Sequence, residues 1–132
     1  DFLTAAKGLG CQWNGRAARV SGVSRLADAL LLCTDVEGMG KAGREAAYRR
    51  LVAATKMQRG WSDAYGYVLV ATGRAEVMLD PEMNPWDCAA LLPVLQEAGG
   101  TFTDWSGVPT IHGGNAIATN GLVFEEVMAL VR

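Results

Sequence analysis

The chain has 132 residues, of which 50% are hydrophobic and 20% are charged, and its formal net charge is −2. This length and apolar content are enough for one compact domain with a buried core. There is no basic excess of the kind that binds nucleic acid or an anionic membrane surface, and no apolar run is long enough to span a bilayer. We therefore expect no nucleic acid and no membrane among its partners.

Its three cysteines, Cys11, Cys33 and Cys88, are odd in number, far apart and never in a CxxC arrangement. That pattern is typical of a reducing compartment and argues against a zinc site, so we expect a cytoplasmic protein. The only histidine, His112, lies in a predicted surface loop, and a histidine-rich metal site is excluded. Any metal here should be a hard ion held by carboxylates.

Short strands are predicted at the start of the chain. Phe2–Ala6 and Cys11–Trp13 flank a glycine turn, and Arg16–Val20 returns after Asn14-Gly15, a strong two-residue hairpin signal. The apolar run Leu26–Thr34 fits a buried strand or a short helix, and we favour the strand.

Two helices are predicted next. Apolar residues recur on one face of Gly43–Gln58, which indicates an amphipathic helix that ends at Gly60. A second helix is expected over Ala64–Thr72, with Ser62 or Asp63 as its N-cap.

A third helix has a clear start signal. Asn84-Pro85-Trp86-Asp87 combines an N-cap, a proline at the first helical position and an acid in the first turn. We expect the helix Trp86–Ala98 to follow, with Trp86 as a packing residue rather than a reactive one. The remaining predicted elements are the strands Ala75–Leu79, Thr101–Asp104 and Asn115–Thr119 and the terminal helix Val123–Val131. This order of elements predicts one α/β sandwich.

The segment Trp86-Asp87-Cys88-Ala89-Ala90, followed a helix later by Glu97-Ala98-Gly99-Gly100, resembles the second signature of the inositol monophosphatase family. Ala5–Val20, Val70–Glu76 and Ala118–Gly121 resemble further stretches of that family, so the resemblance covers nearly the whole chain. It implies a layered α/β sandwich with a mixed, mostly parallel sheet flanked by helices. The histidinol-phosphatase branch is the most similar, through Arg59–Tyr67, Met83–Asp87 and Phe102–Trp105.

The resemblance also implies an incomplete catalyst. In the family, further metal ligands come from an amino-terminal half, through an early glutamate and a D-P-x-D-G-[TS] segment. The nearest string here, Asp80-Pro81-Glu82, lacks the second aspartate and the Gly-Thr. We therefore expect residues 1–132 to be a single domain, the carboxyl-terminal half of a two-domain phosphatase that is inactive alone and a homodimer when intact. The chain does not begin with Met, so we expect the gene product to begin upstream.

Asp87 is the predicted catalytic and metal-binding residue. A carboxylate in a helix's first turn faces unpaired N–H groups and the positive end of the helix dipole, which keep it ionised and aimed. Such a group suits Mg²⁺, the cofactor that the resemblance implies. The alternative is simple capping of the same helix, and the surrounding signature makes us favour metal ligation.

The predicted substrate is a small phosphorylated metabolite. By resemblance, Asp80 falls where a substrate-contacting acid is expected, and Asp63 where inositol-preferring members carry a small residue. Ser62 and Trp61 are predicted substrate contacts beside them, and Trp61 could stack on an imidazole. For Asp63, capping of the following helix is the other interpretation.

Two carboxylates favour a substrate with a cationic end. Histidinol phosphate has an amine and a protonatable imidazole, so it could form charge-assisted hydrogen bonds with both acids. We therefore expect hydrolysis of L-histidinol phosphate, as in histidine biosynthesis. Inositol phosphate or another sugar phosphate is the main alternative, and a non-catalytic binding module is an alternative of another class.

Overall fold

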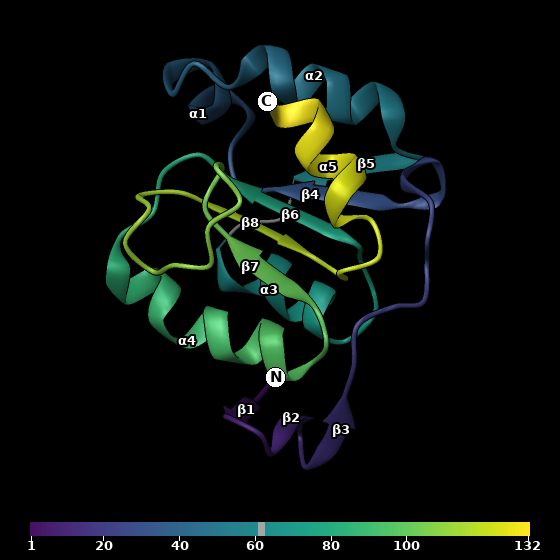
Figure 1. Cartoon of the computed structure of the whole chain (residues 1–132), viewed down its shortest axis with the longest axis vertical. Helices are drawn as coiled ribbons and strands as arrows, with labels where there is room; N and C mark the ends of the chain where they lie inside the picture. Colours follow the sequence, from purple (N-terminus) through teal and green to yellow (C-terminus); the bar gives the residue numbers. More distant parts are fainter. Residues whose placement is uncertain (61–62) are drawn as a thin grey trace.

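The computed structural model describes residues 1–60 and 63–132, whose strands form two separate sheets (Figure 1). The smaller sheet is antiparallel and consists of β1 (Leu3–Ala6), β2 (Gly10–Trp13) and β3 (Arg16–Ala18). β2 turns into β3 at Asn14 and Gly15, whose φ angles are 48° and 78°. Positive φ at both central residues is what a two-residue hairpin requires, and the predicted hairpin is confirmed.

The larger sheet has the strand order β5-β4-β6-β8-β7. Its members are β4 (Leu30–Cys33), β5 (Met57–Gly60), β6 (Val77–Asp80), β7 (Thr101–Thr103) and β8 (Ala116–Thr119). β4 is parallel to both β5 and β6, whereas β8 is antiparallel to β6 and β7. Four strands therefore run in one direction and β8 opposes them, as the predicted mixed, mostly parallel sheet requires.

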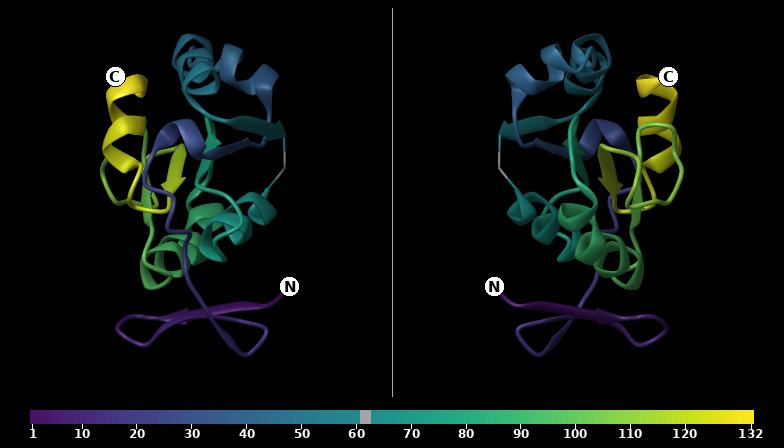
Figure 2. Two further views of the ribbon diagram at one scale, coloured as in Figure 1. Left: turned by 90° about the vertical axis from the view of Figure 1, so that its right-hand side faces the viewer. Right: turned by 90° about the vertical axis from the view of Figure 1, so that its left-hand side faces the viewer.

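Helices cover both faces of the larger sheet and complete the layered sandwich (Figure 2). The helical segments are η1 (Leu26–Asp28), α1 (Val36–Lys41), α2 (Glu45–Ala54), α3 (Ala64–Ala71), α4 (Pro85–Glu97) and α5 (Phe124–Val131). α2 and α5 pack together on one face, α3 and α4 on the other, and the smaller sheet lies beyond α4. None of the described helices is long and apolar enough to cross a bilayer.

The central strands are buried on both sides because their side chains alternate between two cores. Leu31 and Ile117 join the core under α2 and α5, whereas Leu32 and Met78 join the core under α3 and α4. Such strands read as continuous apolar runs rather than as alternating ones.

Two predicted boundaries were wrong, and two short elements were not predicted. The run Leu26–Thr34 divides into η1 and β4, and the helix predicted over Gly43–Gln58 ends at Ala54, after which Met57–Gly60 form β5. β5 is an edge strand with mostly exposed residues, so no apolar pattern marks it. The short helix α1 contains two glycines, which hide it from a propensity argument, although Asp35 caps it.

The connection between the two sheets is held by two buried polar side chains. Glu76 accepts hydrogen bonds from the Leu30 amide at 2.7 Å and from Ser21 Oγ at 2.8 Å. Asn120 Nδ2 donates to Val23 O at 2.8 Å and to Ser21 Oγ at 3.0 Å. Both side chains belong to stretches that carry the family resemblance, so those stretches have a structural role here.

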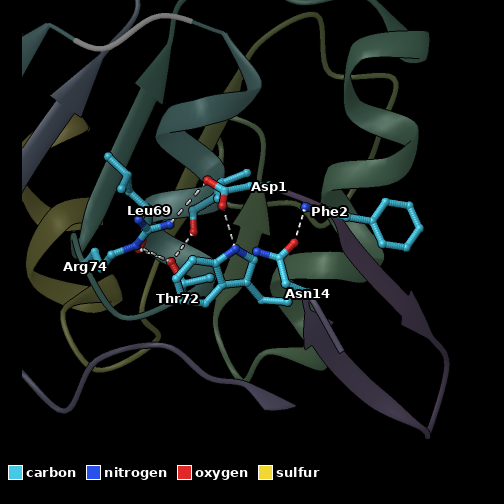
Figure 3. A network of polar contacts seen from close by, with 8 residues as sticks. Asp1, Phe2, Asn14, Leu69, Thr72 and Arg74 are labelled. Atoms are coloured by element: carbon cyan, nitrogen blue, oxygen red, sulfur yellow. Dashed lines mark hydrogen bonds and ion pairs between the residues drawn. The ribbon is translucent and has the colours of Figure 1, made fainter. Parts of the chain in front are cut away.

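The smaller sheet is anchored on α3 and α4 by two charged side chains. The carboxylate oxygens of Glu97 accept the amides of Gly8 and Gly10, each at 2.8 Å, and these bonds lower the pKa of Glu97. Arg74 lies over the Trp13 ring with its guanidinium carbon 4.6 Å from the centroid. Figure 3 shows how the Arg74 guanidinium reaches from the end of α3 towards the first residues of the chain.

Candidate active-site cleft

A cleft of about 310 Å³ lies at the carboxyl edge of three neighbouring parallel strands. Thr34 directly follows β4, Asp80 ends β6, and Asp63 comes shortly after β5. Asp87 enters from the first turn of α4. The full lining is Thr34, Asp63, Ala64, Asp80, Glu82, Met83, Asp87 and Leu91. Ligands of open α/β sheets bind at this edge because the loops that follow parallel strands meet there.

Asp80 is the buried acid of the cleft, with 5% of its surface exposed. The Tyr67 hydroxyl donates to Asp80 Oδ2 at 2.7 Å, and Trp105 Nε1 donates to the Asp80 backbone oxygen at 3.0 Å. Burial raises the pKa of Asp80, whereas the hydrogen bond from the Tyr67 hydroxyl favours its ionised form. Thr34 Oγ1 is buried, yet it makes no hydrogen bond of ordinary geometry with any described residue. A buried polar atom left in this state is available to a ligand.

Asp87 makes the capping contact that the sequence allowed, and it also lines the cleft. Its Oδ2 accepts the Asn84 amide at 3.0 Å, which is the capping contact. The residue is nevertheless exposed and lines the cleft. Within the described part of the chain, no group donates a hydrogen bond to Asp87 Oδ1. Capping therefore occupies one oxygen, and the metal-binding role of Asp87 stays a prediction.

Asp63 occupies the N-cap position of α3, but its side chain makes no capping hydrogen bond. The predicted capping role of Asp63 is therefore wrong. Its backbone has φ 56° and ψ −152°, a region sparsely populated by residues other than glycine and typical of ligand-binding positions. Its carboxylate lines the cleft with Asp80 and Asp87. The other two predicted substrate contacts, Trp61 and Ser62, lie outside the described residues.

The acids of the cleft do not form a metal centre by themselves. Among residues 1–60 and 63–132, no three His, Cys, Asp or Glu side chains lie close enough to hold a metal ion. Asp87 offers a hard oxygen donor of the type that Mg²⁺ prefers, so it fits as one ligand of a larger set. Trp86 beside it is 76% exposed, so residues of this chain do not bury it, and its role as a packing residue stays a prediction.

Sequence reasoning did not find Thr34 or Tyr67. Thr34 is the first polar residue after an apolar run, a weak signal for the end of a buried strand. Tyr67 stands four residues after Asp63, and this spacing places both on one side of α3. Neither signal identifies Asp80 as the hydrogen-bond partner of Tyr67, because the two residues lie in different elements, α3 and β6.

Comparisons with known proteins place this geometry in a family. The Inositol monophosphatase family model matches residues 1–132. The chain is 36% identical to a histidinol-phosphatase of Chlorobaculum parvum over 99% of this chain and 51% of that protein. It is also 36% identical to a histidinol-phosphatase of Mycobacterium tuberculosis, over 94% of this chain and 50% of the relative.

A solved structure agrees with these matches. The inositol monophosphatase from Anabaena (Nostoc) sp. superimposes with a TM-score of 0.85 and 29% identity, over 97% of this chain and 55% of that one. The chain thus spans about half the length of the curated relatives it matches. The resemblance stated from the sequence is confirmed by these matches.

Proposed function

This chain belongs to the inositol monophosphatase family, and we propose from that premise that the intact protein hydrolyses a small phosphate monoester. The observation that carries the proposal is the convergence of three aspartates, beside Glu82, on one cleft. Asp63, Asp80 and Asp87 come from three different elements and line the same cavity. Carboxylates suit both a hard divalent ion and the cationic end of a substrate.

Mg²⁺ is the proposed cofactor, and Asp87 is its proposed ligand in this chain. When bound, the ion would activate a water and neutralise charge on the transferring phosphoryl group. Asp87 contributes one rigid carboxylate to that site, fixed by its contact with the Asn84 amide. The N-terminal end of α4 also favours negative charge.

The remaining ligands are proposed to come from an amino-terminal half of the same protein. Two observations support this. The described residues contain no complete metal-binding group, and Trp86, next to Asp87, is 76% exposed. An exposed tryptophan of this size suits a surface that another part of the protein covers. A homodimer is the proposed assembly, on the basis of the family resemblance alone.

L-Histidinol phosphate is the proposed substrate. Asp63 and Asp80 place two negative charges in the cleft beyond Asp87, and an amino alcohol would form charge-assisted hydrogen bonds with them. The matched relatives from Chlorobaculum and Mycobacterium are histidinol-phosphatases, which agrees with this choice. Inositol 1-phosphate or another sugar phosphate is the alternative, since the similar Anabaena protein is an inositol monophosphatase.

The test compares two esters with the full-length protein and Mg²⁺. We expect hydrolysis of both, with a clear preference for histidinol phosphate over inositol 1-phosphate. Replacing Asp63 with Asn should reduce that preference about tenfold, because a hydrogen bond to a charged group is lost. Asp28→Asn, at an exposed acid of η1, is the matched control and should leave the preference between the two esters unchanged.

Three outcomes would count against parts of this proposal. A wild-type preference for the inositol ester would overturn the substrate assignment. The absence of any esterase activity towards phosphate monoesters would favour the non-catalytic module. A preference unchanged in Asp63→Asn would remove Asp63 from the substrate site.

A further inference from the structure

Tyr67 is a buried side chain that no step of the proposed reaction uses. It is 1% exposed and lies in α3, one turn after Asp63. Its ring packs at 47° to Phe102 with 5.8 Å between the centroids. Its hydroxyl oxygen is 2.7 Å from Asp80 Oδ2, which makes this the shortest polar contact of the cleft acids.

The direction of this hydrogen bond follows from proton counting. The Tyr67 hydroxyl has one proton and two neighbours, Asp80 Oδ2 at 2.7 Å and Met83 Sδ at 3.2 Å. A carboxylate is a far stronger acceptor than a thioether, so the proton points to Asp80. Burial and the Asp80 charge hold the pKa of Tyr67 well above its usual value. Tyr67 is therefore a permanent donor.

The backbone around Asp80 is fixed as well. Trp105 Nε1 donates to the Asp80 carbonyl at 3.0 Å. α3 reaches β6 closely at Gly66, where a Cβ atom would lie 2.5 Å from Met78 Sδ. A glycine at this position lets the helix bring Tyr67 within hydrogen-bonding distance of the end of β6.

We propose that Tyr67 is a positioning residue that ties one oxygen of Asp80 and leaves Oδ1 for the cationic end of the substrate. The inference rests on the proposed function, because it assigns Asp80 to substrate binding. A carboxylate already held in one orientation loses less conformational entropy when the ligand binds. Tyr67 thus acts on affinity and selectivity for the alcohol end, and it takes no part in the chemistry at phosphorus.

The test measures three quantities on the full-length protein: KM and kcat for L-histidinol phosphate, and the inhibition constants of the two products. Tyr67→Phe should raise KM and the inhibition constant of L-histidinol about tenfold, as expected for a hydrogen bond to a charged group. The inhibition constant of inorganic phosphate and kcat should change less than twofold, because the phosphate end does not contact Tyr67.

Tyr48→Phe is the matched control. Tyr48 is also a buried tyrosine, 6% exposed, and its hydroxyl lies 3.5 Å from Cys33 Sγ in the other core. Its replacement removes a buried tyrosine hydroxyl far from Asp80, so it should leave KM unchanged even where it lowers the melting temperature. In an Asp80→Asn background, Tyr67→Phe should add less than a twofold effect, since the carboxylate charge that Tyr67 orients towards the substrate is gone.

The outcomes separate this inference from the proposed function. If Asp80→Asn weakens L-histidinol binding and Tyr67→Phe does not, Tyr67 is not a positioning residue and the proposed function stands. Equal effects of Tyr67→Phe on the two products would show a purely structural role. If Asp80→Asn itself leaves L-histidinol binding intact, both the substrate assignment of Asp80 and the role of Tyr67 are overturned.

Discussion

The five acids Glu76, Glu97, Asp63, Asp80 and Asp87 fall into two groups by how many hydrogen bonds they accept. Glu76 and Glu97 each accept two, from backbone amides and a serine hydroxyl, and each ties a distant segment to the fold. Asp80 and Asp87 each accept one, and Asp63 accepts none from the described residues. A carboxylate with unused acceptor sites has capacity left for a ligand.

This contrast separates the acids that hold the fold together from the acids proposed for the site, although both kinds lie in stretches that carry the family resemblance. Glu97 and Asp87 stand at opposite ends of the same helix and the same signature. Glu97 stabilises the turn between β1 and β2 by accepting the Gly8 and Gly10 amides, whereas Asp87 lines the cleft. Both carboxylate oxygens of Glu97 are used by backbone amides and only one of Asp87 is, which agrees with the ligand role proposed for Asp87.

The largest expected effect is on catalysis at Asp87. In the full-length protein, Asp87→Asn should lower kcat/KM more than about 100-fold with every phosphate ester. Replacing a residue that only supports a metal ligand already costs about 10–100-fold in activity, and replacing the ligand itself should cost at least as much. Glu97→Gln, at the other end of α4, should change kcat/KM less than threefold. Steady-state kinetics with both esters measure this, and comparable losses in the two variants would abolish the distinction.

The second largest expected effect is a loss of folding stability on replacing Glu76. Glu76→Gln replaces an acceptor oxygen with an amide donor at a buried site that receives two hydrogen bonds. It should lower the free energy of unfolding by about 1–3 kcal/mol, with kcat unchanged at a temperature where the variant is folded. Urea unfolding reports the loss, and Glu125→Gln, at an exposed residue of α5, serves as the control. A loss of activity without a loss of stability would place Glu76 in the wrong group.

The smallest effect is a pH dependence at Glu97. The Gly8 and Gly10 amides lower its pKa in the folded state, so the stability it contributes is present above the unfolded pKa of about 4.3. That contribution is lost as the pH falls through the lower folded value. The gap in melting temperature between the wild type and Glu97→Gln should therefore narrow from pH 6 towards about pH 3. A gap independent of pH would refute the amide contacts.

Local signals in the sequence predicted local structure well. Asn14-Gly15 determined a hairpin within four residues, and Asn84-Pro85 marked the start of α4. β5 was missed because an edge strand needs no apolar stripe. α1 was missed because its stability comes from the Asp35 cap and the burial of Met39 rather than from helix propensity.

The site was predicted only as far as the family resemblance reached. Resemblance identified Asp63, Asp80 and Asp87, and the fold places all three on one cleft. The contacts that orient them were not predictable, because Tyr67 and Asp80 are brought together by the packing of α3 on β6. Capping at Asp63 was a reasonable expectation from residue type, but its side chain makes no capping hydrogen bond.

The central claim is that the Asp87 carboxylate binds a divalent ion shared with the amino-terminal half. A crystal structure of the full-length protein with Mn²⁺, located by anomalous scattering, tests it most directly. The account predicts an ion within about 2.0–2.3 Å of an Asp87 oxygen, with the other ligands from outside residues 1–132. Ions bound elsewhere, with both Asp87 oxygens held by α4 amides, would contradict it.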